Sequence, residues 1–113
     1  MKSKIIALSK NEEFKNLLNQ RKISNKYVTI FFGNLINKDP RKLNISFVTK
    51  KKIGNAVKRN KIKRRLRNIT NEAVKKISIN FKYSFLVIAK SSMLNKEYKI
   101  IKETLFRDLE KIK

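Results

Sequence analysis

Apolar residues in the second half of the chain recur at the spacing of helices. Between residues 62 and 77, five of them are separated by four, three, four and four positions, and at about 100° per residue they form one stripe: Ile62, Leu66, Ile69, Ala73 and Ile77. A similar stripe near the C-terminus contains Tyr98, Ile101, Leu105, Leu109 and Ile112. The pattern predicts a long amphipathic helix from about Ala56 and another over residues 95–112.

A shorter helix is predicted near the N-terminus, over residues 10–19. Ser9 and Glu12 have the spacing of a capping box, in which the two side chains accept hydrogen bonds from free backbone N–H groups at the start of a helix. The apolar side of this helix would carry Phe14, Leu17 and Leu18. On this pattern alone, packing in the core is the simplest role for Phe14.

Two strands are predicted next, from alternation and from β-branched and aromatic residues. Residues 21–24 form a short strand, and residues 27–32 form a stronger one. The two faces of the stronger strand carry Tyr27, Thr29 and Phe31 on one side, and Val28, Ile30 and Phe32 on the other. Because both sets are mostly apolar, both faces of this strand are expected to be covered.

The remaining strands follow from turn signals and further alternation. The Asn37-Lys38-Asp39-Pro40 cluster predicts a hairpin turn over residues 33–42 that leads into a returning strand at 43–49. That strand alternates, with Leu43, Ile45 and Phe47 inward and Asn44 and Ser46 on the other side. Beyond a connector at 78–82, residues 83–89 are apolar on both sides, as is typical of a central strand, and Ser91-Ser92 ends it. The order helix, strand, strand, strand, helix, strand, helix predicts one α+β domain with a small mixed sheet.

The start of the predicted long helix is strongly basic. Residues 50–67, KKKIGNAVKRNKIKRRLR, contain ten Lys or Arg side chains and no acid. Gly54 permits a tight turn and Asn55 is a good N-cap, so the positive end of the helix dipole adds to this charge. The side opposite the apolar stripe is polar, with Arg59 and Arg65 on its flanks: Asn60, Lys63, Arg64, Arg67 and Asn71. Such a fixed cationic surface suits a folded polyanion.

Composition favours nucleic acid as that polyanion. The chain has 113 residues, enough for one domain, and a formal net charge of +22 from thirty basic and eight acidic side chains. Such a chain repels itself unless a partner supplies negative charge. A membrane surface is the alternative, but no apolar run approaches the roughly 20 residues that span a bilayer, and the N-terminus lacks a secretory signal. We expect a cytoplasmic protein.

Conventional catalytic chemistry is poorly represented. Cysteine and histidine are absent, which removes the thiolate nucleophile, the commonest general base and the commonest zinc ligands. The eight carboxylates are dispersed, without the spacing of a two-metal cluster. We therefore expect no catalytic residue and no metal ligand in the protein itself.

The segment KKIGNAVKRNKIKRRLR at residues 51–67 resembles the basic signature of the bacterial ribonuclease P protein component. The matching positions are Gly54, Asn55, Ala56, Val57, Arg59, Asn60, Lys63, Arg64 and Arg67. Lys61 departs from the signature, because the family usually has Arg there, and lysine keeps the charge but lacks the planar guanidinium. LSKNEEF at residues 8–14 is similar to the opening of the same family.

The resemblance implies a fold, partners and an activity. The fold is the ribosomal-protein-S5-domain-2-like class, in the order αβββαβα, with a left-handed crossover around the basic helix where right-handed crossovers are the rule. The partners are the catalytic RNA subunit of ribonuclease P and the 5′ leader of precursor tRNA. By this resemblance the protein is a component of a ribonucleoprotein endoribonuclease, and its RNA performs the Mg²⁺-dependent hydrolysis that removes the leader.

The resemblance also implies two binding surfaces. The RNA subunit would be bound by Lys51, Lys52, Gly54, Asn55, Arg59, Asn60, Lys61, Lys63, Arg64 and Arg67. A cleft between the first helix and one sheet face would hold the single-stranded leader against the aromatic side chains of Phe14, Tyr27 and Phe31. The sheet face with Val28, Ile30 and Phe32 is the alternative wall of that cleft.

Other functions share some of these features. A ribosomal or chromatin-type architectural protein would have the same size and charge, and would bind ribosomal RNA or duplex DNA without any processing role. A nuclease acting alone would need a pair of the dispersed carboxylates for its chemistry. A generic basic amphipathic helix explains the charge, but it does not require the GNAV turn.

Overall fold

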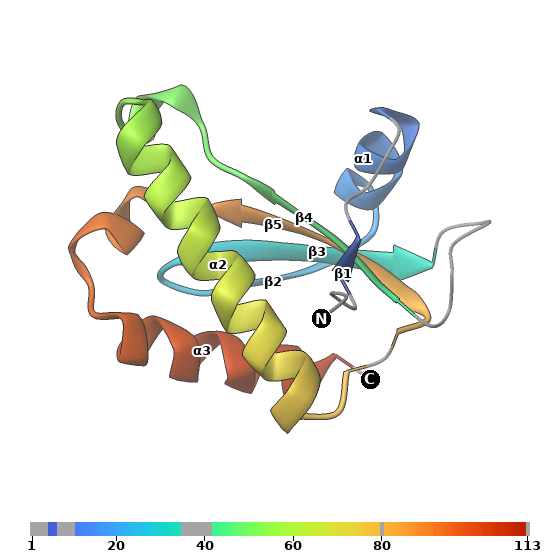
Figure 1. The fold of residues 1–113 in the computed structure, drawn as a ribbon. Coiled ribbons are helices and arrows are strands. Elements are labelled where there is room, and N and C mark those ends of the chain that lie inside the picture. The colour runs from blue at the N-terminus through green and yellow to red at the C-terminus, as the bar shows by residue number, and fades with distance from the viewer. Residues whose placement is uncertain (1–4, 7–10, 35–41, 80, 113) are drawn as a thin grey trace.

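A computed structural model describes residues 5–6, 11–34, 42–79 and 81–112. The strands are β1 (Ile5–Ile6), β2 (Arg21–Ser24), β3 (Val28–Asn34), β4 (Leu43–Val48) and β5 (Tyr83–Ala89). The α-helices are α1 (Asn11–Leu18), α2 (Ala56–Lys76) and α3 (Tyr98–Lys111), and two 3₁₀ helices are η1 (Lys51–Ile53) and η2 (Ser91–Asn95). Figure 1 shows α2 crossing one face of the sheet. The α+β class and the predicted order of elements are confirmed, with β1 added before α1.

The sheet is mixed, with the strand order β1-β4-β5-β3-β2. β5 pairs in parallel with β4 and antiparallel with β3, so it is the central strand, as predicted. The hairpin expected between residues 27–32 and 43–49 is wrong, because β5 lies between β3 and β4. Turn signals show that a chain reverses, but they do not show which strand will later occupy the space beside it.

The crossover from β4 through α2 to β5 is left-handed. In Figure 1, β4 and β5 run in the same direction, and α2 lies on the viewer's side of the sheet. When Figure 1 is turned so that both strands point upward, with α2 toward the viewer, β5 lies to the left of β4. A right-handed crossover would place β5 to the right. The left hand is rare, since right-handed crossovers account for about 98% of parallel connections, and it agrees with the hand implied by the family resemblance.

The main core lies between the sheet and the helices α2 and α3. Val28, Ile30 and Phe32 face it from β3, and each is at most 6% exposed. From α2, Ile62, Leu66, Ile69 and Ala73 are all at most 1% exposed, which confirms the predicted stripe. Ile77 ends the helix as its C-cap and is only half-buried. These four buried residues lie on one side of α2, and they therefore determine which side of the helix faces outward.

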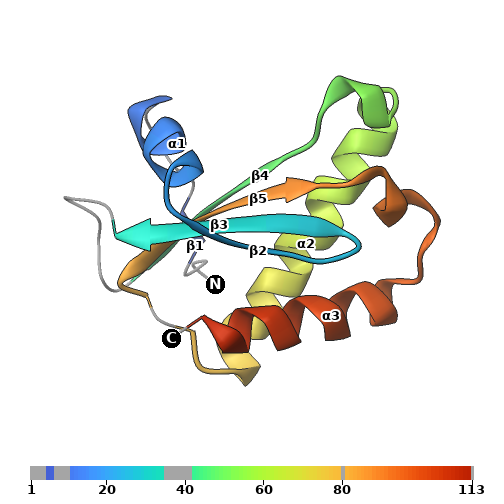
Figure 2. The same cartoon turned by 180° about the vertical axis from the view of Figure 1, so that it is seen from behind.

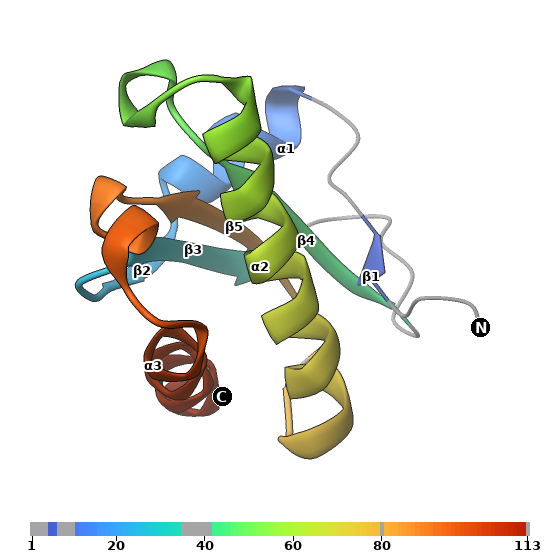
Figure 3. The ribbon, with the colours of Figure 1, turned by 60° about the vertical axis from the view of Figure 1, so that its left-hand side comes forward.

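The helix α3 begins at Tyr98, later than the expected Asn95. The reason is η2, which forms a 3₁₀ turn over Ser91–Asn95 and buries Met93. Figure 3 views α3 nearly along its axis, with α2 beside it. Glu72 of α2 pairs with Lys102 of α3 at 3.3 Å. Burial and the Glu72 carboxylate raise the pKa of the Tyr98 phenol, against the lowering effect of Lys102, so the phenol stays protonated at neutral pH.

The opposite face of the sheet is covered differently. Leu17 of α1 is fully buried there against Leu86 of β5, and Phe31, Val48 and Ile88 around them are only half-buried. Figure 2 views the molecule from this side, with α1 over one end of the sheet. Leu18, expected on the buried side of α1, is 48% exposed, because neighbouring helix positions point about 100° apart. The predicted cap at Ser9 lies outside the described residues.

Candidate nucleic-acid interface

The turn into α2 is built from Gly54 and Asn55, as the sequence predicts. Gly54 has φ 156° and ψ −167°, a conformation that residues with a Cβ rarely adopt, and a Cβ there would lie 2.9 Å from Lys58 Cδ. The Asn55 side chain accepts a hydrogen bond from the Lys58 backbone N–H at 3.0 Å, which confirms both the N-cap and the start at Ala56. Asn55, Ala56 and Val57 are all exposed, so the positive end of the helix is open to solvent.

The residues before the turn continue this surface. Ile53 is 5% exposed and is anchored in the main core, while its neighbours Lys51 and Lys52 are exposed. The first turn of α2 contains no acid. Two ammonium groups and a helix N-terminus thus lie on the same short stretch, where an anion is favoured by both the charge and the free N–H groups.

The outer face of α2 carries Asn60, Arg64 and Arg67, all exposed, together with Asn71, which is half-buried, and Lys63, which is half-buried at the border of the face. Relative to Ile62, the side chains of Lys63, Arg64 and Arg67 point at about 100°, 200° and 140°, so they share an arc of about 100°. These cations therefore form one ridge. The predicted phase of the basic helix is correct.

The other basic residues of this part of α2 lie on its two flanks. Arg59 lies on the flank shared with Lys63; it is half-buried, and its Nε is buried without a hydrogen-bond partner. Lys61 and Arg65 lie on the opposite flank, beside η2, and Arg65 donates to the Lys96 carbonyl at 3.3 Å. Lys61 was predicted together with the ridge, but it stands about 100° from Ile62 on the side away from Lys63. It therefore faces a different part of the surface.

The expected aromatic cleft is only partly assembled among the described residues. Phe31 is half-buried on the sheet face that α1 covers, and Lys22 Nζ lies 5.9 Å from its ring centroid. Tyr27 does not share this face: it is 5% exposed in the main core. It lies in a bend before β3, which starts at Val28, so the alternation does not extend to it. Phe14 is within α1, but its side chain lies outside the described part.

The alternative cleft wall is excluded. Val28, Ile30 and Phe32 are buried in the main core with residues of α2 and α3, and no ligand reaches them without unfolding that core. The sequence pattern did not point to Lys22, whose position opposite Phe31 follows from the pairing of β2 with β3. Nor were Lys58 and Arg65 predicted as a pair on one flank of α2. The helical period would have grouped them, since they are seven residues apart.

Among the described residues, no three His, Cys, Asp or Glu side chains are close enough together to hold a metal ion. Within the same part of the chain, no helix is long and apolar enough to cross a bilayer. The fold and this surface together define a class: a small, strongly basic α+β protein whose longest helix presents a cationic ridge held at a fixed angle by the core.

Comparison with known proteins identifies the family. The Ribonuclease P family model matches residues 3–113. The ribonuclease P protein component of Carboxydothermus hydrogenoformans is 38% identical over 102 residues, covering 87% of this chain and 83% of that protein. The one from Mycoplasma mycoides subsp. mycoides is 30% identical over 113 residues and 100% of both chains. The solved RNase P protein from Thermotoga maritima shares the fold, with a TM-score of 0.77 and 23% identity over 96% of this chain and 98% of that one. The chain belongs to the ribonuclease P protein family.

Proposed function

We propose that this protein binds the catalytic RNA subunit of ribonuclease P and assists it in removing the 5′ leader from precursor tRNA in the cytoplasm. The observation that carries the proposal is the ridge of Lys63, Arg64 and Arg67, whose direction is fixed by four buried residues on the other side of α2. A shaped array of cations matches a folded RNA better than a mobile basic tail, because less conformational entropy is lost on binding.

The leader would occupy the face of the sheet on the α1 side. Phe31 offers a half-buried aromatic ring, and Lys22 lies beside it to neutralise a phosphate. Single-stranded RNA is commonly held in this way, by base stacking on aromatic rings next to cationic side chains. Tyr27 would not contact the leader, because it is buried in the main core.

The chemistry would belong to the RNA. The described carboxylates form no metal-binding group, and the chain has no histidine or cysteine to act as a base or nucleophile. Mg²⁺ would be held by RNA phosphates, where hard oxygen ligands are abundant. The protein contributes by binding and positioning, which raises the effective concentration of the leader at the catalytic RNA.

The test is reconstitution with the RNA subunit and precursor tRNA at low Mg²⁺. Adding the protein should increase leader removal, and Arg64→Ala or Arg67→Ala should weaken RNA binding and reduce the slope of log affinity against log salt by about one each. Both variants should keep the unfolding temperature of the parent, because both side chains are exposed. Lys99→Ala, which removes an exposed charge from α3, is the matched control.

Two outcomes would contradict the proposal. If leader removal did not improve at any of several salt concentrations, while ribosomal RNA or duplex DNA bound tightly, an architectural role would replace it. If the protein alone cleaved RNA and lost that activity on replacement of a carboxylate, the protein would be a nuclease in its own right.

A further inference from the structure

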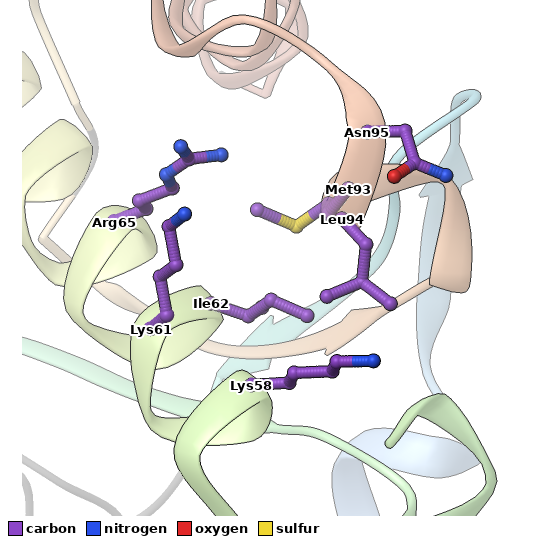
Figure 4. A pocket seen from close by; sticks show the side chains of 7 residues that line it. All are labelled: Lys58, Lys61, Ile62, Arg65, Met93, Leu94 and Asn95. Atoms are coloured by element: carbon purple, nitrogen blue, oxygen red, sulfur yellow. The ribbon is translucent and has the colours of Figure 1, made fainter. Parts of the chain in front are cut away.

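A pocket lies beside α2 on the flank away from Lys63, between the first half of the helix and η2. Its volume is about 200 Å³, and it is lined by Lys58, Lys61, Ile62, Arg65, Met93, Leu94 and Asn95. Figure 4 shows Lys61 and Arg65 extending from α2 on one side of the space, with Met93 and Leu94 facing them from η2. The pocket is separate from the ridge, whose side chains point to the opposite half of the helix surface.

The floor and the rim of this pocket differ in chemistry. The floor is apolar: Leu94 is half-buried and keeps some accessible surface, and Ile62 and Met93, which are at most 1% exposed, close the pocket around it. The rim carries the cations of Lys58, Lys61 and Arg65, and no acid lines the pocket. Within the part of the chain that the structure describes, neither lysine has an ion-pair partner. Three like charges around one opening repel each other, so an anion placed there would be favoured.

These features favour one class of ligand. A simple anion would leave the accessible part of Leu94 in water, and an apolar molecule would leave the cations without a partner. A nucleotide satisfies both, because its base is a flat ring with apolar faces and its phosphate is an anion. The volume is below the roughly 300–1,000 Å³ of sites for drug-sized molecules, so it accommodates one ring system.

The path out of the pocket is also basic. Asn95 lines this pocket and also a second groove, whose other lining residues are Lys26, Tyr27, Ser92 and Lys96. A strand with one base in the pocket could therefore continue along the groove with its next phosphates beside Lys26 and Lys96. That continuity favours a polynucleotide over a free mononucleotide as the natural ligand.

We propose that this pocket receives one unpaired nucleotide of the RNA partner, with its base against Leu94, next to the buried Ile62 and Met93, and its phosphate against Lys58, Lys61 and Arg65. The proposal rests on the proposed function, since the RNA is its ligand. It assigns Lys61 to this pocket and not to the ridge. Contacts on two sides of α2, about 150° apart, would fix the rotation of the RNA about the helix as well as its distance from it.

Selective labelling of methionine methyl groups with ¹³C gives a direct test. The chain has two methionines, Met1 and Met93, so one of two NMR signals reports on the pocket. Adenosine 5′-monophosphate, and a short single-stranded RNA at lower concentration, should shift the Met93 signal upfield and saturably, through the ring current of the base. Ribose 5-phosphate, which lacks the base, should cause no such shift.

Two variants separate the floor from the rim. Leu94→Gln keeps the charge and removes part of the apolar floor, and it should lower affinity for the RNA partner by about 5- to 150-fold with an unchanged salt slope. Lys58→Gln with Lys61→Gln should reduce the salt slope by up to about 0.7, the value for one phosphate of a single strand. Ile100→Gln, at an exposed apolar position of α3, and Lys99→Gln are the matched controls and should change neither quantity.

Several results would overturn the proposal. An unmoved Met93 signal with RNA bound, while Arg64→Ala still weakened binding, would reject the pocket and leave the proposed function standing. An acidic peptide that shifted Met93 as strongly as RNA would show that the pocket takes a protein segment. Should Leu94→Gln fail to fold, the Met93 titration of the unaltered protein still decides the question.

Discussion

Asn55 shows how one side chain serves both the fold and the charged surface. Its Oδ1 accepts the hydrogen bond from the Lys58 N–H at 3.0 Å, while the residue itself remains exposed beside Lys51 and Lys52. The same position therefore begins the helix and borders the anion-binding end. These two roles can be separated by mutation. Capping needs only an oxygen acceptor, whereas the binding of a polyanion also depends on the charge of the side chain at this position.

We predict that Asn55→Asp keeps the stability of the protein and weakens its binding to RNA. The carboxylate still caps the helix and interacts favourably with the dipole, but it places a negative charge where phosphate should bind. Asn55→Ala, by contrast, should lower the free energy of unfolding by about 1 kcal/mol through loss of the cap. Urea unfolding and RNA titration of both variants check this. Equal RNA affinity for Asn55→Asp and the parent would mean that no phosphate approaches this end of the helix.

At the scale of elements, α2 is held by packing more than by its own sequence. Positive charges along one helix repel each other, and like charges three or four positions apart destabilise an isolated helix. The buried stripe offsets this, with Leu66 at 1% exposure near the middle of the helix. The ridge keeps its direction only while that stripe is seated in the core.

We expect Leu66→Ala to lower the free energy of unfolding by about 2–5 kcal/mol, the range for truncating a fully buried leucine. Chemical denaturation measures this, with Asn68→Ala as the control, because Asn68 is exposed and points about 100° away from Ile69 of the stripe. RNA binding should weaken only in proportion to the unfolded fraction. An unchanged unfolding midpoint for Leu66→Ala would show that Leu66 does not face the core and that α2 is rotated about its axis.

The whole molecule concentrates a formal charge of +22 within a radius of gyration of 13.3 Å. At about 0.01 M salt the Debye length is about 30 Å, so most of these charges repel one another, whereas at about 0.15 M it is about 8 Å and only neighbours interact. Little of this charge is neutralised by the two ion pairs between side chains of the described residues, which join Glu72 to Lys102 and Asp108 to Lys111.

The unfolding temperature should therefore rise between about 0.01 M and 0.15 M potassium chloride, because screening relieves repulsion that is greater in the compact state than in the extended one. Bound RNA should raise it further, since a ligand that binds only the folded state stabilises that state. Scanning calorimetry over a salt series measures both effects. Potassium sulfate at equal ionic strength separates screening from the binding of a particular anion. A fall in unfolding temperature over this range would contradict the expectation.

Much of α2 and of its surface could be predicted, because the relevant geometry lies within one element. The period of Ile62, Leu66 and Ile69 fixes the buried side, and therefore places Arg64 and Arg67 on the other. The cleft was harder to predict, since it depends on where β3 starts. A strand beginning at Val28 in place of Tyr27 was enough to move Tyr27 into the main core.

By itself, the sequence determined the local properties: the N-cap at Asn55, the phase of the basic helix, and the two-sided apolar character of residues 83–89, which form the central strand. Tertiary structure alone decided that β5 enters between β3 and β4, that the crossover is left-handed, and that η2 meets the Lys58 and Lys61 flank of α2. The physical reason is the sequence separation of the residues that make each contact. Helix phase and capping arise from contacts within a few residues, whereas neighbours in a sheet and the walls of a pocket come from segments that meet only when the whole core forms.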